Sequence, residues 1–163
     1  MSDAKKTNAM RILESMGIPF QTDRYEFDED ALDAVTAAGK LGIEAGRVFK
    51  TIVMRTDENE ICVFCVPADR EVSLKKARAA SGAREIAPVK GHELLALTGY
   101  VRGGCSPIGM KKRYRVFIDE TAVLYDRVHV SAGLRGIQLV ISGDDLARAA
   151  DAVFADIALE AAR

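Results

Sequence analysis

The sequence predicts an α/β (α+β) fold in which helices pack outside a mixed, largely antiparallel sheet. Its 163 residues suit a single domain spanning residues 1–163, with one hydrophobic core. Apolar residues make up 48% and charged residues 29%, which is typical of a globular protein. Segments with the period of strands alternate with segments of helical period. They follow no regular strand–helix–strand rhythm, and this favours a mixed sheet.

The first half of the chain is predicted to contain two helices, an edge strand and a hairpin. Apolar spacing predicts a helix over residues 7–16, and Pro19 then begins a strand over 18–27 that belongs at a sheet edge. An Ala-rich segment followed by glycines predicts a second helix over 31–40. The β-rich segments 48–55 and 60–66 flank a polar turn at 56–59, so they form the clearest hairpin in the chain.

The second half continues the alternation of helices and strands. Ser73 caps a helix over 74–81 that ends at Gly82. A brief strand over 84–88 and a helix over 91–97 follow, and strands are predicted over 115–119, 127–131 and 136–141. A last helix begins at 142–145, and the tail 153–157 adds apolar side chains without a predicted element.

The charge pattern limits the classes of partner. The formal net charge of −1 excludes a uniformly basic nucleic-acid-binding protein but allows a local cationic patch. The first seven residues lack the apolar run of a signal peptide, and no stretch approaches the roughly 18 apolar residues of a membrane span. We therefore expect a cytoplasmic protein with no membrane partner.

The cysteines and histidines do not indicate a metal site. Cys62 and Cys65 have the spacing of a metal-binding or redox pair, but residues three apart on a strand point to opposite faces. We expect both to be buried core thiols. His92 and His129 have no Cys or His near them at ligand spacing. The sequence thus predicts no metal and no cofactor.

Lys50 lies in an otherwise largely apolar strand segment. Strand alternation places it on the same face as Ile52 and Met54, which resemble core residues. A buried ammonium group is costly unless it is paired or meets an anionic ligand. Two interpretations remain open: a cation in a binding pocket, or a lysine at the end of the sheet whose head group reaches water.

A glycine-rich loop interrupts the regular pattern at residues 103–109, and four cations follow it closely: Lys111, Lys112, Arg113 and Arg115. Glycine allows backbone N–H groups to approach a ligand, so such a loop can hold an anion or an oxyanion. The alternative is a surface turn followed by a solvated run of charges.

The common catalytic loop motifs do not fit this segment. A P-loop requires Gly-Lys-Ser/Thr, whereas Gly109 is followed by Met110. Ser106 is followed by Pro107, which lacks the N–H that a serine-hydrolase elbow needs for its oxyanion hole. A nucleophilic pair of Cys105 with one of the histidines stays open, since such partners meet only in space.

Four segments in this order and spacing together resemble the YbaK/EbsC family of aminoacyl-tRNA deacylases. They are KTNAMRILE at 6–14, VFKTI at 48–52, TGYVRGGCSPIGMKK at 98–112 and VSAGLRG at 130–136. The likeness spans roughly the whole chain. It implies a barrel-like mixed sheet flanked by helices, related to the editing domain inserted in some prolyl-tRNA synthetases.

The resemblance also implies a function and a set of site residues. The function is hydrolysis of the ester that joins a wrong amino acid to tRNA, typically cysteine on the proline tRNA. The catalytic positions it implies are Lys50, Gly103, Gly104 and Ser106. The substrate-binding positions it implies are Tyr25, Thr51, Cys105, Pro107, Gly109, Ser131, Arg135 and Gly136. Ala132 stands where the family's last motif usually has glycine.

The reaction suggests how these groups act. Ester cleavage develops an oxyanion, which N–H donors from residues 103–106 and a cation such as Lys50 would stabilise. The resemblance implies that a cysteine substrate attacks its own ester through its thiol, aided by ribose hydroxyls of the tRNA. Phosphates of the acceptor end would then contact a basic group of Arg102, Lys111, Lys112 and Arg113.

The expected partners are mischarged tRNA and a prolyl-tRNA synthetase that would select the tRNA. Two alternatives remain open at this point. One is a deacylase for another amino acid, such as alanine. The other is a non-catalytic module that binds the tRNA acceptor end.

Overall fold

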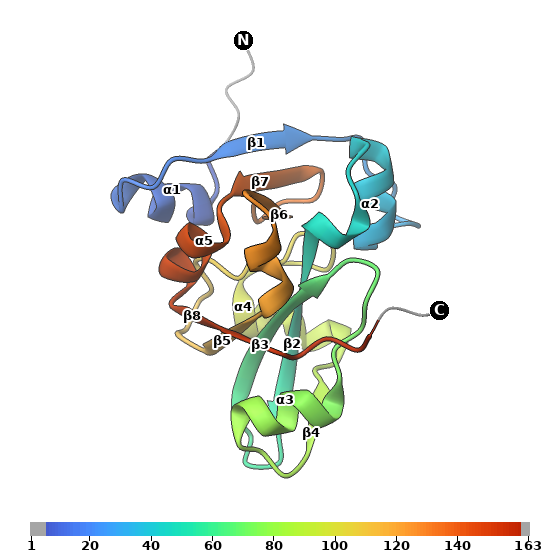
Figure 1. Cartoon of the computed structure of the whole chain (residues 1–163), viewed down its shortest axis with the longest axis vertical. Helices are drawn as coiled ribbons and strands as arrows, with labels where there is room; N and C mark the ends of the chain where they lie inside the picture. Colours follow the sequence, from blue (N-terminus) through green and yellow to red (C-terminus); the bar gives the residue numbers. More distant parts are fainter. Residues whose placement is uncertain (1–5, 161–163) are drawn as a thin grey trace.

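The computed structural model describes residues 6–160, which form one mixed sheet with helices on both of its faces (Figure 1). The strands lie in the order β1-β7-β6-β2-β3-β5-β8, and β4 pairs with β2 beside this path. Their bounds are β1 Gln21–Arg24, β2 Val48–Thr56, β3 Ile61–Pro67, β4 Ile86–Pro88, β5 Arg115–Asp119, β6 Val128–Ser131, β7 Ile137–Ile141 and β8 Ala152–Ala155.

Five α-helices and three short 3-10 helices connect the strands. The α-helices are α1 Asn8–Ser15, α2 Ala34–Leu41, α3 Leu74–Ser81, α4 Leu94–Thr98 and α5 Gly143–Ala150. The 3-10 helices are η1 Ala45–Arg47, η2 Gly91–Glu93 and η3 Glu120–Leu124. In Figure 1, α1 and α5 lie together on one side of the molecule, α2 lies on the other, and α3 lies near the turn between β2 and β3.

Four helices begin where a side-chain oxygen caps the first turn. Thr7, Asp33, Ser73 and Ser142 each accept a hydrogen bond from a backbone N–H three residues later. Such a cap satisfies an N–H group that would otherwise lack a partner, and it typically stabilises a helix by about 1 kcal/mol. The caps therefore fix where the helices start relative to the sheet.

The sheet divides the apolar interior into two main layers. Residues of β3 alternate between them, so that Cys65 belongs to the cluster with α1 and Cys62 to the cluster with α3. In the second layer the rings of Phe64 and Phe117 stack with their centres 5.2 Å apart. The single core expected from the sequence is therefore two layers, because helices cover both faces of the sheet.

The predicted elements agree well with the structure, with one strand missed. The β2–β3 hairpin, the helix over 74–81 and the strand over 115–119 are confirmed, and β1 lies at the sheet edge as Pro19 indicates. Mixed pairing is confirmed, with β2–β6, β3–β5 and β5–β8 parallel and the other four pairs antiparallel. The tail predicted to lack an element contains β8. Within residues 6–160 no helix has the length and apolarity to span a membrane.

Candidate active site

A cavity of about 380 Å³ opens beside the middle of β2. One edge of β2 pairs with β6 at Val48 and Phe49 and with β4 from Met54 onward, so Lys50 to Ile52 lie between these two partners. The start of α2, the end of β3, the glycine-rich loop and strands β6 and β7 supply the remaining walls. The gap between the partners of β2 is therefore what creates this site.

Lys50 lines this cavity, and its ammonium group is already partly engaged. Its Nζ lies 3.0 Å from Oε1 of Glu71 and 3.3 Å from the carbonyl oxygen of Ala68. The lysine side chain is 20% exposed. An ammonium group has three N–H donors, so one remains for a ligand in the cavity. Of the two interpretations of Lys50, its position favours the pocket cation.

Only the first part of the glycine-rich loop lines the cavity, through Gly103 and Cys105, together with Arg102 just before it. Gly104 instead packs against the turn that follows β6. A Cβ built on Gly104 would lie 3.0 Å from the backbone nitrogen of Arg135, which is too close for any other residue to fit without movement. Nε of Arg135 donates to the carbonyl of Arg102 at 2.9 Å. The loop and the turn are thus held together as one wall.

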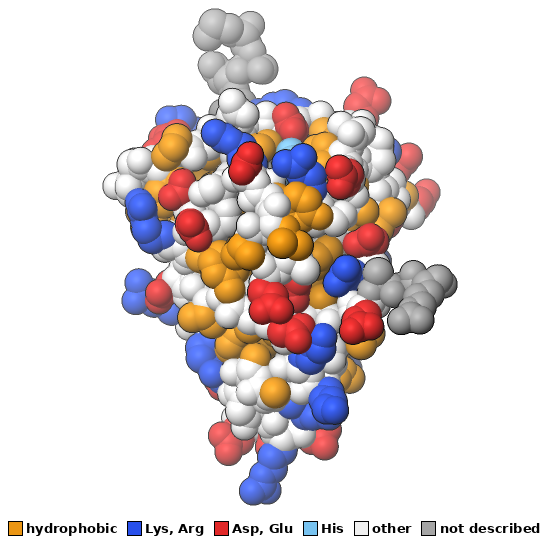
Figure 2. Space-filling view, in the orientation of Figure 1, with side chains coloured by type: hydrophobic (Ala, Val, Ile, Leu, Met, Phe, Trp, Pro, Cys, Tyr) orange, Lys and Arg blue, Asp and Glu red, His pale blue; other side chains and the backbone are white. Residues whose placement is uncertain are grey.

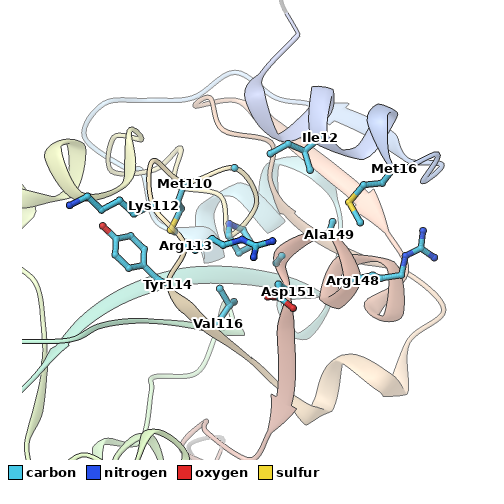
Figure 3. Close-up of a pocket in the computed structure, with 13 residues that line it drawn as sticks. Ile12, Met16, Met110, Lys112, Arg113, Tyr114, Val116, Arg148, Ala149 and Asp151 are labelled. Carbon is cyan, nitrogen blue, oxygen red and sulfur yellow. The ribbon is translucent and has the colours of Figure 1, made fainter.

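The remainder of the loop turns into the protein and away from this cavity. Ser106 is fully buried, and its Oγ accepts a hydrogen bond from the N–H of Ile108, which is also fully buried. Pro107 and Gly109 line a second cavity on the other side of the loop (Figure 3). The sequence predicts that residues 103–109 form one anion-binding loop. In the structure, Ile108 is buried and the loop is divided between two cavities.

The other predicted substrate-binding residues lie at or next to the first cavity. Tyr25, Thr51 and Ser131 line it. Gly136 lies behind Tyr25, where a Cβ would be 2.9 Å from the tyrosine carbonyl oxygen and where φ is +83°. Both facts require glycine at this position.

The alanine that replaces the usual glycine of the family motif fits this turn. Ala132 has no exposed surface, its side chain belongs to the core, and its backbone does not adopt a positive φ. A Cβ is therefore accommodated there without strain.

Sequence reasoning missed several residues of the cavity wall: Leu32, Asp33, Glu71 and Gln138. Asp33 caps α2, and hydrogen bonds from the side chain and the N–H of Thr36 lower the pKa of its carboxyl. Gln138 is 5% exposed, and its Oε1 has no hydrogen-bond partner among the described residues. Of these residues, only Asp33 has a recognisable sequence signal, as a helix cap. Gln138 lies within an apolar segment that predicts a core strand.

The cavity lacks an activated side-chain nucleophile. Burial raises the pKa of the Cys105 thiol to about 12, so this thiol is protonated near neutral pH and is a poor nucleophile. Neither His92 nor His129 lines the cavity. The pairing of Cys105 with a histidine, which the sequence left open, receives no support from this arrangement.

The remaining cysteines behave as core residues. Cys62 and Cys65 are both fully buried and lie in opposite layers of the interior, as strand alternation predicts. Burial raises the pKa of the Cys65 thiol to about 12. Residues 6–160 contain no group of three or more His, Cys, Asp or Glu side chains that could hold a metal ion.

The predicted tRNA-contacting cations lie on both sides of the loop. Arg102 lies at the first cavity, while Lys112 and Arg113 line the second. Lys111 packs over Gly99, where its Cγ lies 3.2 Å from the position that a Cβ would occupy. The basic group named from the sequence is therefore spread around the loop.

Comparison with known proteins identifies the family of this chain. Residues 28–149 match the family model of the aminoacyl-tRNA editing domain. The chain is 40% identical over 153 residues to a protein of Enterococcus faecalis named "Putative Cys-tRNA(Pro)/Cys-tRNA(Cys) deacylase EbsC", covering 94% of this chain and 93% of that one. It is also 32% identical over 105 residues to a proline–tRNA ligase of Anaeromyxobacter, covering 60% of this chain and 18% of the ligase.

The fold also matches that of a solved structure. A crystal structure described as a "putative trans-editing enzyme for prolyl tRNA synthetase" superposes with a TM-score of 0.83, at 21% identity, and covers 98% of this chain and all of the other. The expectation of a YbaK-type fold is confirmed. The match over most of its length, together with the 40% identity, shows that this chain belongs to the aminoacyl-tRNA editing domain family, the family of deacylases that its motifs indicate.

Proposed function

We propose that this protein hydrolyses the ester bond of mischarged aminoacyl-tRNA in trans, with cysteine on the proline tRNA as its substrate. The observation that carries the proposal is the meeting of Lys50 with Gly103 and Ser131 in one cavity. These three residues come from segments 28 or more positions apart, and each segment is one of those that resemble the editing family. The cytoplasm, where tRNA is charged, is the expected place of the reaction.

We take the whole chain as one deacylase domain. The family match covers residues 28–149, but the elements outside it join the same fold. Side chains of α1 belong to the core cluster that contains β3, and β8 pairs with β5 through four residues. A version that lacks either element would expose buried apolar surface.

The chemistry needs no nucleophile from the protein. In the proposed reaction the thiol sulfur of the substrate bonds to its own carbonyl carbon and the ester C–O bond breaks. The terminal ribose oxygen leaves with a proton, and water then opens the thioester. The protonated state of Cys105 supports this route, because the cysteine nearest the substrate is not activated.

The protein would stabilise the charge that develops on the carbonyl oxygen. Within residues 6–160, the N–H groups of Gly103 and Cys105 donate no hydrogen bond, whereas that of Gly104 donates to Val101 at 2.9 Å. We therefore assign Gly103 and Cys105 as the backbone donors and give Gly104 a packing role. The third N–H of Lys50 is available to the ester or the terminal ribose.

Contacts with the tRNA body would be electrostatic. Arg102, Lys111, Lys112 and Arg113 are exposed and flank the loop that forms the cavity wall. Cations that contact phosphates add affinity but little sequence selectivity. Choice of the proline tRNA would then depend on a partner such as prolyl-tRNA synthetase.

The deciding experiment measures release of amino acids from several mischarged tRNAs, with a protein-free control for spontaneous hydrolysis. Rapid release from cysteinyl-tRNA(Pro) that is absent from the control supports the proposal. Faster release from alanyl-tRNA would identify a deacylase for another amino acid. Binding of tRNA without any release would identify a non-catalytic module for the acceptor end.

A further inference from the structure

The second cavity, of about 390 Å³, has no part in the chemistry proposed above. It lies between the end of α1, the end of α5 and the segment that follows the glycine-rich loop (Figure 3). Its volume falls within the range of small-molecule pockets, roughly 300–1,000 Å³. Its lining joins two kinds of surface, one cationic and one apolar.

The cationic part consists of Lys112, Arg113 and Arg148, against the single carboxylate of Asp151. Figure 3 shows the Arg113 side chain pointing toward α5, while Lys112 and Arg148 extend outward on opposite sides. Among the described residues Lys112 and Arg113 form no ion pair, and Arg148 has only a 3.8 Å contact with Asp145. Among the described residues, Lys112 and Arg113 are thus free to meet an anion, and Arg148 is held only by one long contact.

The positive charge is local. The whole chain has a formal net charge of −1, and on the face seen in Figure 2 acidic and basic side chains are interspersed.

The apolar part includes Ile12, Met16, Met110 and Val116. Met16 is 39% exposed although it is a large apolar side chain. Methionine is flexible and polarisable, and its sulfur makes favourable contacts with aromatic rings. A ligand with both an aromatic ring and a negative charge would match this lining, and a nucleotide has both.

We propose that this cavity holds a nucleotide of the tRNA strand that leads to the esterified 3′ end. A base would pack on Met16 and Ile12, and phosphates would meet Arg113 and Arg148. The inference rests on the proposed function for the identity of the RNA. It adds an RNA-binding site, separate from the ester cavity, that includes residues of α1 and α5.

The spacing of the two cavities allows one strand to reach both. Gly103 lines the first cavity and Gly109 the second, and six residues span at most about 20 Å. A stacked strand advances roughly 3.4 Å per nucleotide, so at most about six nucleotides separate the two cavities. A single strand whose last nucleotide occupies the ester cavity can therefore also reach the second cavity.

The test measures binding of uncharged tRNA to the full chain as a function of salt. Replacing Arg148 by alanine is expected to weaken binding roughly fivefold and to lower the slope of log K against log salt by about one. Met16→Ala is expected to weaken binding by a similar factor without changing that slope, whereas Met16→Leu keeps most of the affinity. Lys75→Ala, an exposed cation on α3, is the matched control and should change neither quantity.

Several outcomes would overturn the inference. If Met16→Ala binds tRNA as well as the unchanged protein does, the cavity does not hold a base. If Lys75→Ala weakens tRNA binding as much as Arg148→Ala does, the loss of affinity reflects the overall positive charge of the protein and not a site at this cavity. If adenosine monophosphate binds as tightly as tRNA in a Met16-dependent way, the site serves free nucleotides instead. Because no ester is present, these results are independent of whether the protein deacylates tRNA.

Discussion

Replacement of Lys50 by alanine tests the proposed chemistry most directly. Loss of a single donor to a developing oxyanion typically lowers kcat about 10²- to 10³-fold, or roughly 3–4 kcal/mol. The proposed role of the lysine therefore predicts that Lys50→Ala loses nearly all release of cysteine from cysteinyl-tRNA(Pro). The measurement is single-turnover release of labelled cysteine, corrected for spontaneous hydrolysis.

The same change should affect stability little. The Glu71 side chain that pairs with Lys50 is 76% exposed, and a pair of this kind contributes about 0–1 kcal/mol. For a chain of this size that corresponds to a fall in Tm of at most roughly 4 °C. A thermal unfolding curve thus separates loss of chemistry from loss of fold.

Lys76 provides the matched control. Its Nζ lies 2.9 Å from Oδ1 of Asp156 and 3.0 Å from the carbonyl of Ala158, which repeats the bonding of Lys50 outside the cavity. Lys76→Ala should keep full activity with a similar small change in Tm. If Lys50→Ala retains activity within about threefold, or if both variants lose activity equally, the assignment of Lys50 to the oxyanion or ribose is wrong.

Three further predictions concern the loop and the sheet. Cys105→Ala should keep substantial deacylation, because a thiol with a pKa of about 12 is not the nucleophile; an inactive but folded variant would restore that role. Gly104→Ala should lower stability by about 1–3 kcal/mol in denaturant unfolding, since its Cβ would meet the Arg135 nitrogen at 3.0 Å. Gly91→Ala, whose Cβ meets nothing within 4 Å, is the control and should not be destabilised comparably. Burial lowers the pKa of His129 in the folded protein. As the pH falls below about 6.5, the unfolded chain therefore binds a proton before the folded protein does, and Tm should decrease. His129→Gln should lack this drop, and an equal drop in both proteins would assign it to other groups.

The fold was predictable wherever one local signal defined an element. The capping Ser73 and the terminal Gly82 gave the bounds of α3, and alternation gave the opposite faces of Cys62 and Cys65. Strand β8 was missed because it is four residues long and pairs in parallel with β5, more than 30 residues earlier. Local periodicity contains no information on such a partner.

The site was predictable as a set of segments but not as a shape. The sequence motifs predicted Lys50 and the loop as site residues. Only the structure shows that Ile108 is buried and that the two halves of the loop line different cavities. Gln138 could not be found from the sequence, because a single polar residue in an apolar strand has no period of its own. Its position depends on the pairing of β7 with β6.

The dimensions of the ester cavity bear on how cysteine would be selected. The cavity volume of about 380 Å³ does not distinguish cysteine from alanine, because alanine is smaller and enters as easily. One additional or missing small group on a substrate changes its binding free energy by only about 1–3 kcal/mol. The proposed route discriminates differently, because an alanyl ester has no thiol and so lacks the nucleophile itself. Selection for cysteine would then come from the substrate's own thiol. This is consistent with a site in which Cys105 is protonated and the protein only binds the ester and stabilises the charge on its carbonyl oxygen.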